Sequence, residues 1–406
     1  MTRAFQSFAA LLALAASPAG AADAPQDPER VEWKLLPLGA GNTDIGVLLG
    51  ALGVASGLSD DPSLPYRWQV LGQLAMSFKR GPSGIELPIQ DHFVTLDWLD
   101  VPGRHFRLQV AAEYATAINA GYYGLGNASE AGSGRAHQYQ GALADVSAVA
   151  RWTDFGKLRP IVGLLGRFAS PTPYPGSRLE TDVLAGEPLL IGVQRHFLGQ
   201  LSLGLEWDGR DDQLDPHRGL WAVMALRGTP SVLTQLDKSW GAASLVVRTY
   251  HPFFGENLVL AFRIVGDVLA GDPPIEELSR AGAFQSLWYL GGSTGVRGVP
   301  EGRFQGKLRT IANLELRTMP VHFRLWGERG ELGAVAFFDA GRVWADWQPR
   351  PELDGPGVRL HYGTGGGVRF RWGEAFVVRL DVAYSPDAAI DGGPPLGVYM
   401  DVGQIF

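Results

Sequence analysis

The glycine-rich stretch Gly291–Gly306, GGSTGVRGVPEGRFQG, holds residues whose types and spacing could support chemistry. Its first five residues match the G-x-S-x-G pattern, in which a serine nucleophile sits on a sharp turn between a strand and a helix. Arg297, Gly298 and Pro300 follow the serine, and this composition does not begin the helix that the pattern requires. We therefore expect no catalytic role for Ser293.

Other reactive constellations are also missing from the sequence. The eight histidines are scattered and form no H-E-x-x-H pair. GRDDQLD (209–215) lacks the spacing and the closing glutamate of a calcium loop, and GTGGG (363–367) lacks the lysine and helix of a phosphate loop. The chain has no cysteine, which excludes disulfides and zinc–thiolate sites. The sequence predicts a protein that is not an enzyme and that holds no metal or cofactor.

Arg297 is the residue of this stretch with the clearest binding chemistry. Its guanidinium stays protonated and presents a planar fork that matches a carboxylate. The surrounding glycines let the backbone lie close to a neighbouring surface and adopt positive φ angles. The alternative is a solvated surface charge with little energetic weight. Which of the two applies depends on the elements that carry the loop.

The composition and the N-terminus indicate an exported protein. Charged residues make up only 19% of the 406-residue chain, against about a quarter in a typical soluble domain. The net charge of −7 argues against a nucleic-acid partner. Arg3, an apolar run and small residues near position 21 have the layout of a secretory signal peptide over residues 1–21, with cleavage after Ala21 or Ala22. The alternative is a short buried helix.

An alternation of polar and apolar residues with period two dominates the chain from about Asp44 onward. In QLSLGLEWDG, Leu201, Leu203 and Leu205 share one face, whereas Ser202 and Glu206 share the other. Periodicity alone would also fit a soluble sandwich. The strands, however, are close to the ~9–11 residues that cross a bilayer, and their polar face carries full charges, which a dry core would not tolerate.

These features predict an outer-membrane β-barrel with a water-filled lumen and no unpaired strand edge in the lipid. Aromatic residues at strand ends are typical of the interfacial girdle of such barrels: Trp98, Trp152, Trp207, Trp221, Trp344, Trp372 and Tyr384. Short turns alternate with long connections, of which the longest are residues 119–136, 170–198, 269–306 and 345–362.

Fifteen strands can be assigned from the pattern, and an antiparallel bacterial barrel requires an even number. The expected strands are 44–56, 67–78, 92–100, 105–118, 137–153, 159–169, 199–208, 218–228, 240–251, 257–268, 307–318, 332–344, 363–372, 375–385 and 397–406. Trp33–Ala40 is the candidate for the sixteenth. We therefore predict an all-β fold, a 16-stranded antiparallel transmembrane barrel over residues 44–406, preceded by a short periplasmic segment at 22–43.

Seven segments resemble, in chain order, the BamA/TamA-type outer-membrane assembly and secretion barrels, the bacterial surface antigen family. LGGSTGVRGVPEGRF resembles the lid-loop motif of that family, a Val-Arg-Gly followed by an aromatic residue, here Val296, Arg297 and Gly298. The next position holds Val299, and Phe304 is the first aromatic after it. The other six segments are 122–127 (YYGLGN), 205–221, 313–317 (NLELR), 336–344 (AFFDAGRVW), 363–370 and 378–385.

The resemblance implies that the lid loop folds into the barrel and that Arg297 pairs with Asp339 and Glu315 on the inner wall. The residue chemistry agrees with this pairing. Glu315 lies on the charged face of its strand, and Asp339 is an acid among apolar neighbours, where an unpaired charge would be costly. We expect charge reversal at Asp339 to cripple the protein and exchange of the Arg–Asp pair to restore it in part.

The final segment, VYMDVGQIF, resembles the C-terminal signal strand that the barrel-assembly machinery reads, with Tyr399, Gly403 and Phe406 at the expected positions. An edge-pairing interaction of this kind is β-augmentation. The alternative is an ordinary last strand. About twenty residues separate the cleavage site from the first clear strand, which predicts a stand-alone barrel without the POTRA domains of the family's assembly factors.

The predicted function is the insertion or translocation of protein or lipid at the bacterial outer membrane, with the lid loop and a weak seam between the first and last strands as the working parts. The alternative is a passive porin-like or structural surface-antigen barrel. Expected partners are outer-membrane lipid, the assembly machinery during biogenesis and a periplasmic protein, but no nucleic acid.

Overall fold

The computed structural model describes residues 31–42, 45–57, 66–81, 84–99, 101, 105–132, 134–213, 215–254, 257–282, 284, 290–325, 328–372, 376–389, 393–402 and 404–406. The predicted signal peptide, its cleavage site and Gly403 lie outside the described residues.

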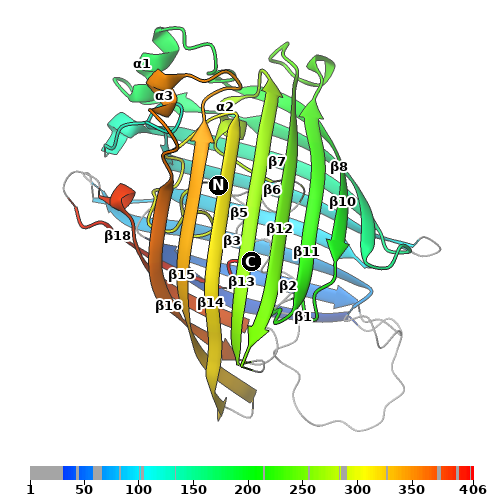
Figure 1. Ribbon diagram of the computed structural model, residues 1–406. Helices are drawn as coiled ribbons and strands as arrows, with labels where there is room; N and C mark the ends of the chain where they lie inside the picture. The colour runs from blue at the N-terminus through cyan, green and yellow to red at the C-terminus, as the bar shows by residue number, and fades with distance from the viewer. Residues whose placement is uncertain are drawn as a thin grey trace.

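The chain forms one closed antiparallel sheet in which each wall strand pairs with its neighbours in sequence (Figure 1). Over the described residues the sheet contains eighteen strands, of which β4 (Gly84–Glu86) and β9 (Thr172–Pro173) are short additions. The other sixteen form the wall, which confirms the predicted barrel. They are β1 (Val31–Asn42), β2 (Gly46–Gly57), β3 (Trp68–Gly81), β5 (Ile89–Trp98), β6 (Phe106–Gly121), β7 (Gln138–Trp152), β8 (Leu158–Ala169), β10 (His196–Asp208), β11 (Gly219–Thr229), β12 (Trp240–Phe253), β13 (Leu258–Gly271), β14 (Leu308–Leu325), β15 (Glu328–Trp344), β16 (His361–Trp372), β17 (Phe376–Tyr384) and β18 (Leu396–Val402).

The sixteenth strand is β1, which contains the predicted candidate Trp33–Ala40. It pairs with β2 along its whole length, from Val31 opposite Gly57 to Asn42 opposite Gly46. The expected boundary at residue 44 is therefore wrong, because residues 31–42 belong to the wall and not to a periplasmic segment. The physical reason is that an antiparallel barrel closes only when the first and last strands can pair.

The alternation of the sequence is the alternation between the two faces of the wall. On β10, Leu201 and Leu203 are 49% and 59% exposed on the outer surface, whereas Ser202 and Glu206 are buried inside. On β14, Leu314 lies outside and Glu315 inside. An apolar outer belt around a charged interior reverses the arrangement of a soluble protein and suits a lipid environment.

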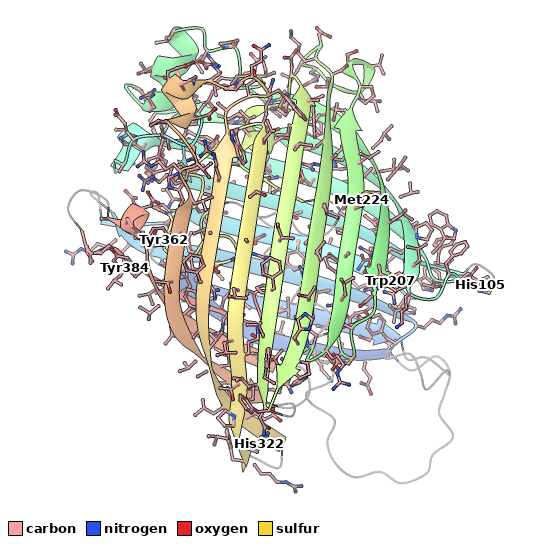
Figure 2. The ribbon with its side chains drawn as sticks, viewed as in Figure 1. His105, Trp207, Met224, His322, Tyr362 and Tyr384 are labelled. Atoms are coloured by element: carbon pink, nitrogen blue, oxygen red, sulfur yellow. The ribbon has the colours of Figure 1, made fainter. Side chains whose placement is uncertain are left out.

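Figure 2 shows the labelled Trp207, Met224 and Tyr362 projecting from the outer surface, and each is partly exposed. Trp221, which was expected in the aromatic girdle, instead faces the lumen, where its indole Nε1 donates to Glu206 at 2.8 Å. Successive side chains of a strand point to opposite faces, and Met224 of β11 points outward. Trp221, an odd number of positions earlier, must therefore point inward.

The long connections gather at one end of the barrel and the short turns at the other, as predicted (Figure 1). The long connections carry the short helices α1 (Arg178–Leu184), α2 (Ile275–Leu278) and α3 (Pro351–Asp354). The β14–β15 hairpin, marked by His322 in Figure 2, extends at the opposite end. Within the described residues, no helix is long and apolar enough to cross a bilayer.

The seam between the first and last strands is short. Among the described residues, β1 and β18 pair at Gly41 with Met400 and at Asn42 with Tyr399, whereas β1 and β2 pair at twelve positions. The expected final strand 397–406 is too long, because β18 ends at Val402 and Phe406 lies buried in the barrel. Arg263 of β13 and Arg317 of β14 donate to the carbonyl oxygens of Ile405 and Phe406, which lie outside the sheet.

Candidate functional site

The connection between β13 and β14 folds into the barrel and fills part of its lumen. In its 291–306 loop, Val296, Val299 and Phe304 are almost completely buried and pack on wall residues that include Ile311 and Val343. That these side chains form a core could not be predicted from the sequence, because their apolar partners come from strands distant in the chain. The loop is therefore a packed part of the barrel interior.

Arg297 lies at the centre of the lumen contacts and is fully buried. Its Nε and Nη2 donate to the two carboxylate oxygens of Asp339 at 2.7 and 3.0 Å, which is the bidentate geometry that arginine favours. Its Nη1 lies 2.7 Å from a carboxylate oxygen of Glu315 and 3.1 Å from one of Asp381. The structure thus brings Arg297 together with both acids named from the sequence and adds Asp381.

Burial disfavours the charged guanidinium, but the three carboxylates outweigh this cost and raise the pKa of Arg297 above its usual value. The guanidinium carbon also lies 3.4 Å from the centre of the Phe337 ring, so the cation is covered on one face by an aromatic side chain. Asp381 could have been noticed in the sequence, because it alternates with Arg379 on the polar face of β17.

Glycines in the wall leave the space that the loop backbone occupies. A Cβ atom at Gly363 would lie 1.8 Å from the carbonyl oxygen of Arg297, and one at Gly367 would lie 2.0 Å from Oδ1 of Asp381. Gly298 has a φ of 93°, which L side chains rarely adopt, and its N–H donates to the hydroxyl of Tyr399 at 2.9 Å. Within the GTGGG segment, Gly363 therefore leaves room for the loop backbone, and Gly367 leaves room for the side chain of Asp381.

A balanced set of charges surrounds the anchor. Glu315 also accepts from Arg317 at 2.7 Å, and Asp381 accepts from Arg369 at 2.6 Å. Asp339 has no second arginine among the described residues; Asn313 donates to it at 2.8 Å, as does the backbone N–H of Arg297 at 3.1 Å. Of the three acids, Asp339 therefore depends most on Arg297.

The second half of the loop docks on the 122–127 segment and on β16. The Phe304 ring stacks on His361 with 3.6 Å between ring centres. His361 binds Asp387 at 2.8 Å through Nδ1 and the carbonyl oxygen of Asn127 at 2.9 Å through Nε2. In the sequence, the YYGLGN segment was noted only because it resembles the family. In the structure it forms part of the surface on which this loop docks.

A second ionic anchor of opposite polarity holds the same connection through α2. Glu277 is buried and accepts from Arg167 of β8 at 2.9 Å and from Arg227 of β11 at 3.4 Å. Burial raises the pKa of this carboxyl, but Arg227 and Arg167 lower it more, so the net pKa lies below its usual range. Sequence reasoning missed this anchor, because nothing in the order of residues places the IEEL turn beside β8 and β11.

The other candidate chemistries remain without support in the part of the chain that the structure describes. The Ser293 hydroxyl donates to Asp401 at 3.4 Å, and its carbonyl oxygen accepts from Arg379, so this serine belongs to the ionic network. No helix follows it. Among the described residues, no group of three or more histidines and acids has the arrangement of a metal site.

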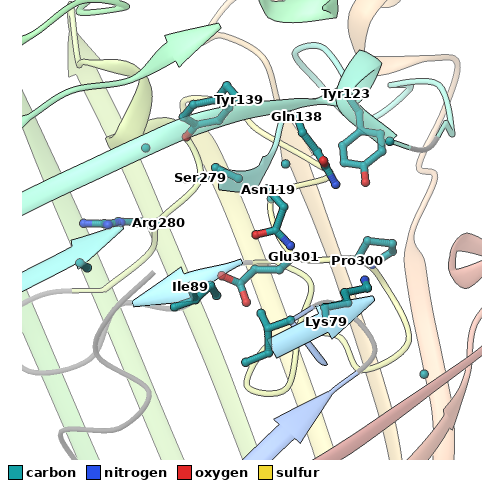
Figure 3. A pocket seen from close by; sticks show the side chains of 18 of the residues that line it. Lys79, Ile89, Asn119, Tyr123, Gln138, Tyr139, Ser279, Arg280, Pro300 and Glu301 are labelled. Atoms are coloured by element: carbon teal, nitrogen blue, oxygen red, sulfur yellow. The ribbon is translucent and has the colours of Figure 1, made fainter. Parts of the chain in front are cut away.

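A cavity of about 470 Å³ lies beside the loop (Figure 3). Pro300 and Glu301 of the loop face Lys79, Ile89 and Asn119 of the wall across it, and Tyr123, Gln138 and Tyr139 close the side toward β7. The loop therefore leaves open space toward β3 to β7 and the first residues of β18, while its buried side chains pack against β14 and β15.

The predicted C-terminal signal residues separate in the folded barrel. Tyr399 lies on β18 and faces the loop, Gly403 is outside the described residues, and Phe406 lies in the lumen near Tyr250. The expectation that all three share one continuous wall strand is wrong for Phe406, because the tail leaves the sheet after Val402.

The Omp85 superfamily domain matches residues 103–406, which is 304 of the 406 residues. A comparison with curated proteins found no match. The fold is similar to BamA from Haemophilus ducreyi lacking POTRA domains 1–3, with a TM-score of 0.60 and 13% identity over 92% of this chain and 70% of that one.

It is also similar to CdiB from Escherichia coli, with a TM-score of 0.60 and 14% identity over 94% of this chain and 63% of that one. For CdiB from Acinetobacter baumannii the TM-score is 0.51 and the identity 11% over 92% and 65% of the two chains. The chain thus spans less than two thirds of either CdiB chain, and at these identities the likeness concerns the fold.

Proposed function

Because the chain belongs to the Omp85 superfamily and is an outer-membrane barrel related to BamA and CdiB, we propose that it assists the insertion or translocation of an envelope component, protein or lipid, at that membrane. Barrels of this family are not enzymes, and the proposed work involves no covalent step. It requires exchange of hydrogen bonds at a strand edge and local disturbance of the bilayer.

The observation that carries the proposal is the position of the anchor relative to the seam. Arg297 binds acids on β14, β15 and β17, and Gly298 binds Tyr399 on β18. The loop therefore contacts the strands that lead to the seam, and the part of the seam that the structure describes is paired at two positions. Movement of the loop and opening of the seam are coupled in this arrangement, because both depend on the position of β17 and β18.

The seam offers an edge for a client strand. Over the described residues, β1 pairs with β18 at its last two positions, whereas all of its positions pair with β2. An open strand edge is a template for β-augmentation. We assign the lid role to the 291–306 loop and the signal role to Tyr399, Gly403 and Phe406, which the assembly machinery would read before the tail folds into the lumen.

A reversible cross-link across the seam tests the proposal. The chain has no cysteine, so Gly39→Cys with Met400→Cys creates a single diagonal pair on the outer face beside the closing register, and a Cβ at position 39 meets no atom within 4 Å. The control pair, Leu226→Cys with Ala243→Cys, joins β11 and β12 where pairing is continuous. Each protein is placed in liposomes, and the insertion rate of an unfolded outer-membrane barrel and the transbilayer movement of a labelled phospholipid are measured.

Joining the seam pair with a short bis-methanethiosulfonate reagent is expected to reduce the accelerated rate to that of empty liposomes. Reduction should restore the rate, while the control pair treated in the same way stays active. Full activity with a locked seam would reject the proposal. A steady, large, ion-selective current in planar bilayers, without any acceleration of insertion or lipid movement, would instead support the passive pore.

A further inference from the structure

His196, the first residue of β10, has an oxygen atom within hydrogen-bond distance of each of its ring nitrogens. Its Nδ1 lies 2.8 Å from the carbonyl oxygen of Gln194, and its Nε2 lies 3.0 Å from Oε1 of Glu276 on α2. The side chain of His196 is 1% exposed. Glu276 belongs to the connection between β13 and β14, so this histidine holds that connection to the wall.

His361, the first residue of β16, has the same arrangement. Its Nδ1 lies 2.8 Å from Oδ2 of Asp387, and its Nε2 lies 2.9 Å from the carbonyl oxygen of Asn127. The ring is buried and stacks on Phe304 of the 291–306 loop. A second histidine with an acceptor at each nitrogen therefore holds another part of the same connection.

The acceptors fix the number of protons in each contact. A carbonyl oxygen only accepts, so Nδ1 of His196 and Nε2 of His361 must each carry a hydrogen. In a neutral ring the other nitrogen would then be a bare acceptor facing a carboxylate oxygen, which also only accepts when it is ionised. Each contact therefore holds one proton more than a neutral histidine beside an ionised acid. This count is the same whether the proton is drawn on the ring or on the acid.

The charges around His196 make this proton important for docking. Arg167 of β8 opposes a positive ring, but Arg167 itself is paired with Asp145 at 2.7 Å and with Glu277 at 2.9 Å. Among the described residues, Glu276 forms no ion pair with an arginine or a lysine, and the His196 ring is its ion-pair partner. Loss of the proton would remove the counter-charge of a buried acid on α2.

The surroundings of His361 include more positive charge. Arg303 lies 3.6 Å from Oδ1 of Asp387, and Arg359 also acts on this acid electrostatically. Loss of the proton would leave Asp387 these arginines, but it would place a bare ring nitrogen against Oδ2. It would also remove a cation from the face of the Phe304 ring, where a positive charge is attracted by the π electrons.

We propose that His196 and His361 are proton-binding sites that make docking of the connection between β13 and β14 depend on pH. Both contacts form with a proton bound and are lost when the proton leaves. The connection is therefore held more tightly at low pH and loosens as the pH rises through the range in which histidine titrates, about pH 5 to 8. This pH dependence belongs to the connection itself and does not depend on what the barrel transports.

Two buried positions of the connection can report its docking. Leu278 lies in α2, two residues after Glu276, and Val299 lies in the 291–306 loop; neither is more than 1% exposed. Because the chain has no cysteine, Leu278→Cys and Val299→Cys each provide a single thiol. The rate of maleimide labelling is measured in detergent micelles between about pH 5 and 9. Each rate is divided by the rate for the same variant in denaturant at the same pH, which corrects for ionisation of the thiol.

The corrected rate should be lowest at acidic pH and should rise with pH, by at most about tenfold per pH unit for each proton released. His196→Gln should flatten the curve at position 278, and His361→Gln should flatten it at position 299, because glutamine does not titrate. Each substitution should also raise the corrected rate at low pH by about tenfold, since a charge-assisted hydrogen bond is lost.

His105→Gln is the matched control. This ring is 78% exposed in a short turn and lies 3.1 Å from Asp154, so its replacement should change neither curve. A corrected rate that stays constant between about pH 5 and 9 with both native histidines in place would refute the proposal, and this measurement requires no histidine substitution. A pH dependence that persists in the double variant His196→Gln/His361→Gln would refute the assignment to these two rings.

Discussion

The strongest prediction concerns the unequal effects of removing the two members of the Arg297–Asp339 pair. In Arg297→Ala, Glu315 keeps Arg317 and Asp381 keeps Arg369, but Asp339 keeps only Asn313 and the backbone N–H of residue 297. A fully buried carboxylate then lacks a cation. In Asp339→Asn, by contrast, Arg297 retains Glu315 and Asp381, and the amide still accepts a hydrogen bond.

The magnitudes follow from these remaining contacts. Leaving one buried charge uncompensated costs about 3–5 kcal/mol, so Arg297→Ala should weaken docking of the 291–306 loop by that amount. Asp339→Asn should cost roughly 1–3 kcal/mol, the range for loss of a hydrogen-bond partner at a buried group. The double variant should cost less than the sum of the two, because the orphaned carboxylate is gone.

Because the chain has no cysteine, a single introduced cysteine can be labelled specifically with a maleimide. Val299 is fully buried in the loop and makes no side-chain hydrogen bond, so Val299→Cys reports exposure of the loop. The rate of maleimide labelling in micelles should rise by roughly two to three and a half orders of magnitude with Arg297→Ala. Arg350→Ala is the control, because this arginine pairs with Glu187 and Glu352 near the surface, where an ion pair contributes about 1 kcal/mol or less.

The reasoning would be refuted by labelling of Arg297→Ala within about threefold of the parent, or by a larger effect of Asp339→Asn than of Arg297→Ala. The structure also revises the charge-exchange experiment suggested by the sequence. An aspartate at position 297 would face Glu315 and Asp381 as well as the new arginine, so exchange with Asp339 should restore little.

Three further outcomes are expected. Glu277→Gln keeps the shape of the α2 anchor but removes the loop charge that Arg167 and Arg227 bind, although these arginines keep Asp145 and Asp267 of the wall. It should accelerate labelling of the same cysteine by about tenfold, and equal rates would argue against a second anchor. Gly363→Ala should prevent native docking of the loop, because its Cβ would lie 1.8 Å from the carbonyl oxygen of Arg297; a variant as resistant to trypsin as the parent would contradict this. Burial raises the pKa of Asp387, but its bond to the His361 ring and nearby positive charges lower it more, so the net pKa lies below its ordinary value. Its contribution to stability is therefore complete above about pH 4 and is lost as the pH falls through the folded value. Thermal unfolding followed by tryptophan fluorescence between pH 3 and 7 should show a loss that Asp387→Asn abolishes.

The two anchors fix the connection between β13 and β14 to the barrel wall at two separate places. One places a loop arginine among wall acids, and the other places a loop acid among wall arginines. The anchors contact different parts of the wall, the first near the seam and the second on β8 and β11. Release of the first anchor alone would therefore free the loop tip near the seam while α2 stays attached.

The sequence by itself determined the barrel, the side of most strands that faces lipid, and the residue at the centre of the lumen. A period of two is a local property of the strand backbone. When one face of each strand carries charges and the other leucines, a closed barrel is the arrangement that keeps the charges out of the lipid and pairs every strand edge. Arg297, Asp339 and Glu315 could be named in advance because a resemblance supplied the pairing and the residue chemistry agreed with it.

Only the tertiary structure decided which distant residues share the lumen. Asp381 joins the anchor, Glu277 finds Arg167 and Arg227, and Phe406 leaves its strand for Arg317, each across a separation that strand periodicity does not encode. The physical reason is that closure of the barrel places side chains from distant strands and loops in one lumen. Buried charges then pair with the nearest opposite charge, because leaving them unpaired has a high free-energy cost. For the last residues of the chain, this pairing is more favourable than continuation of the strand.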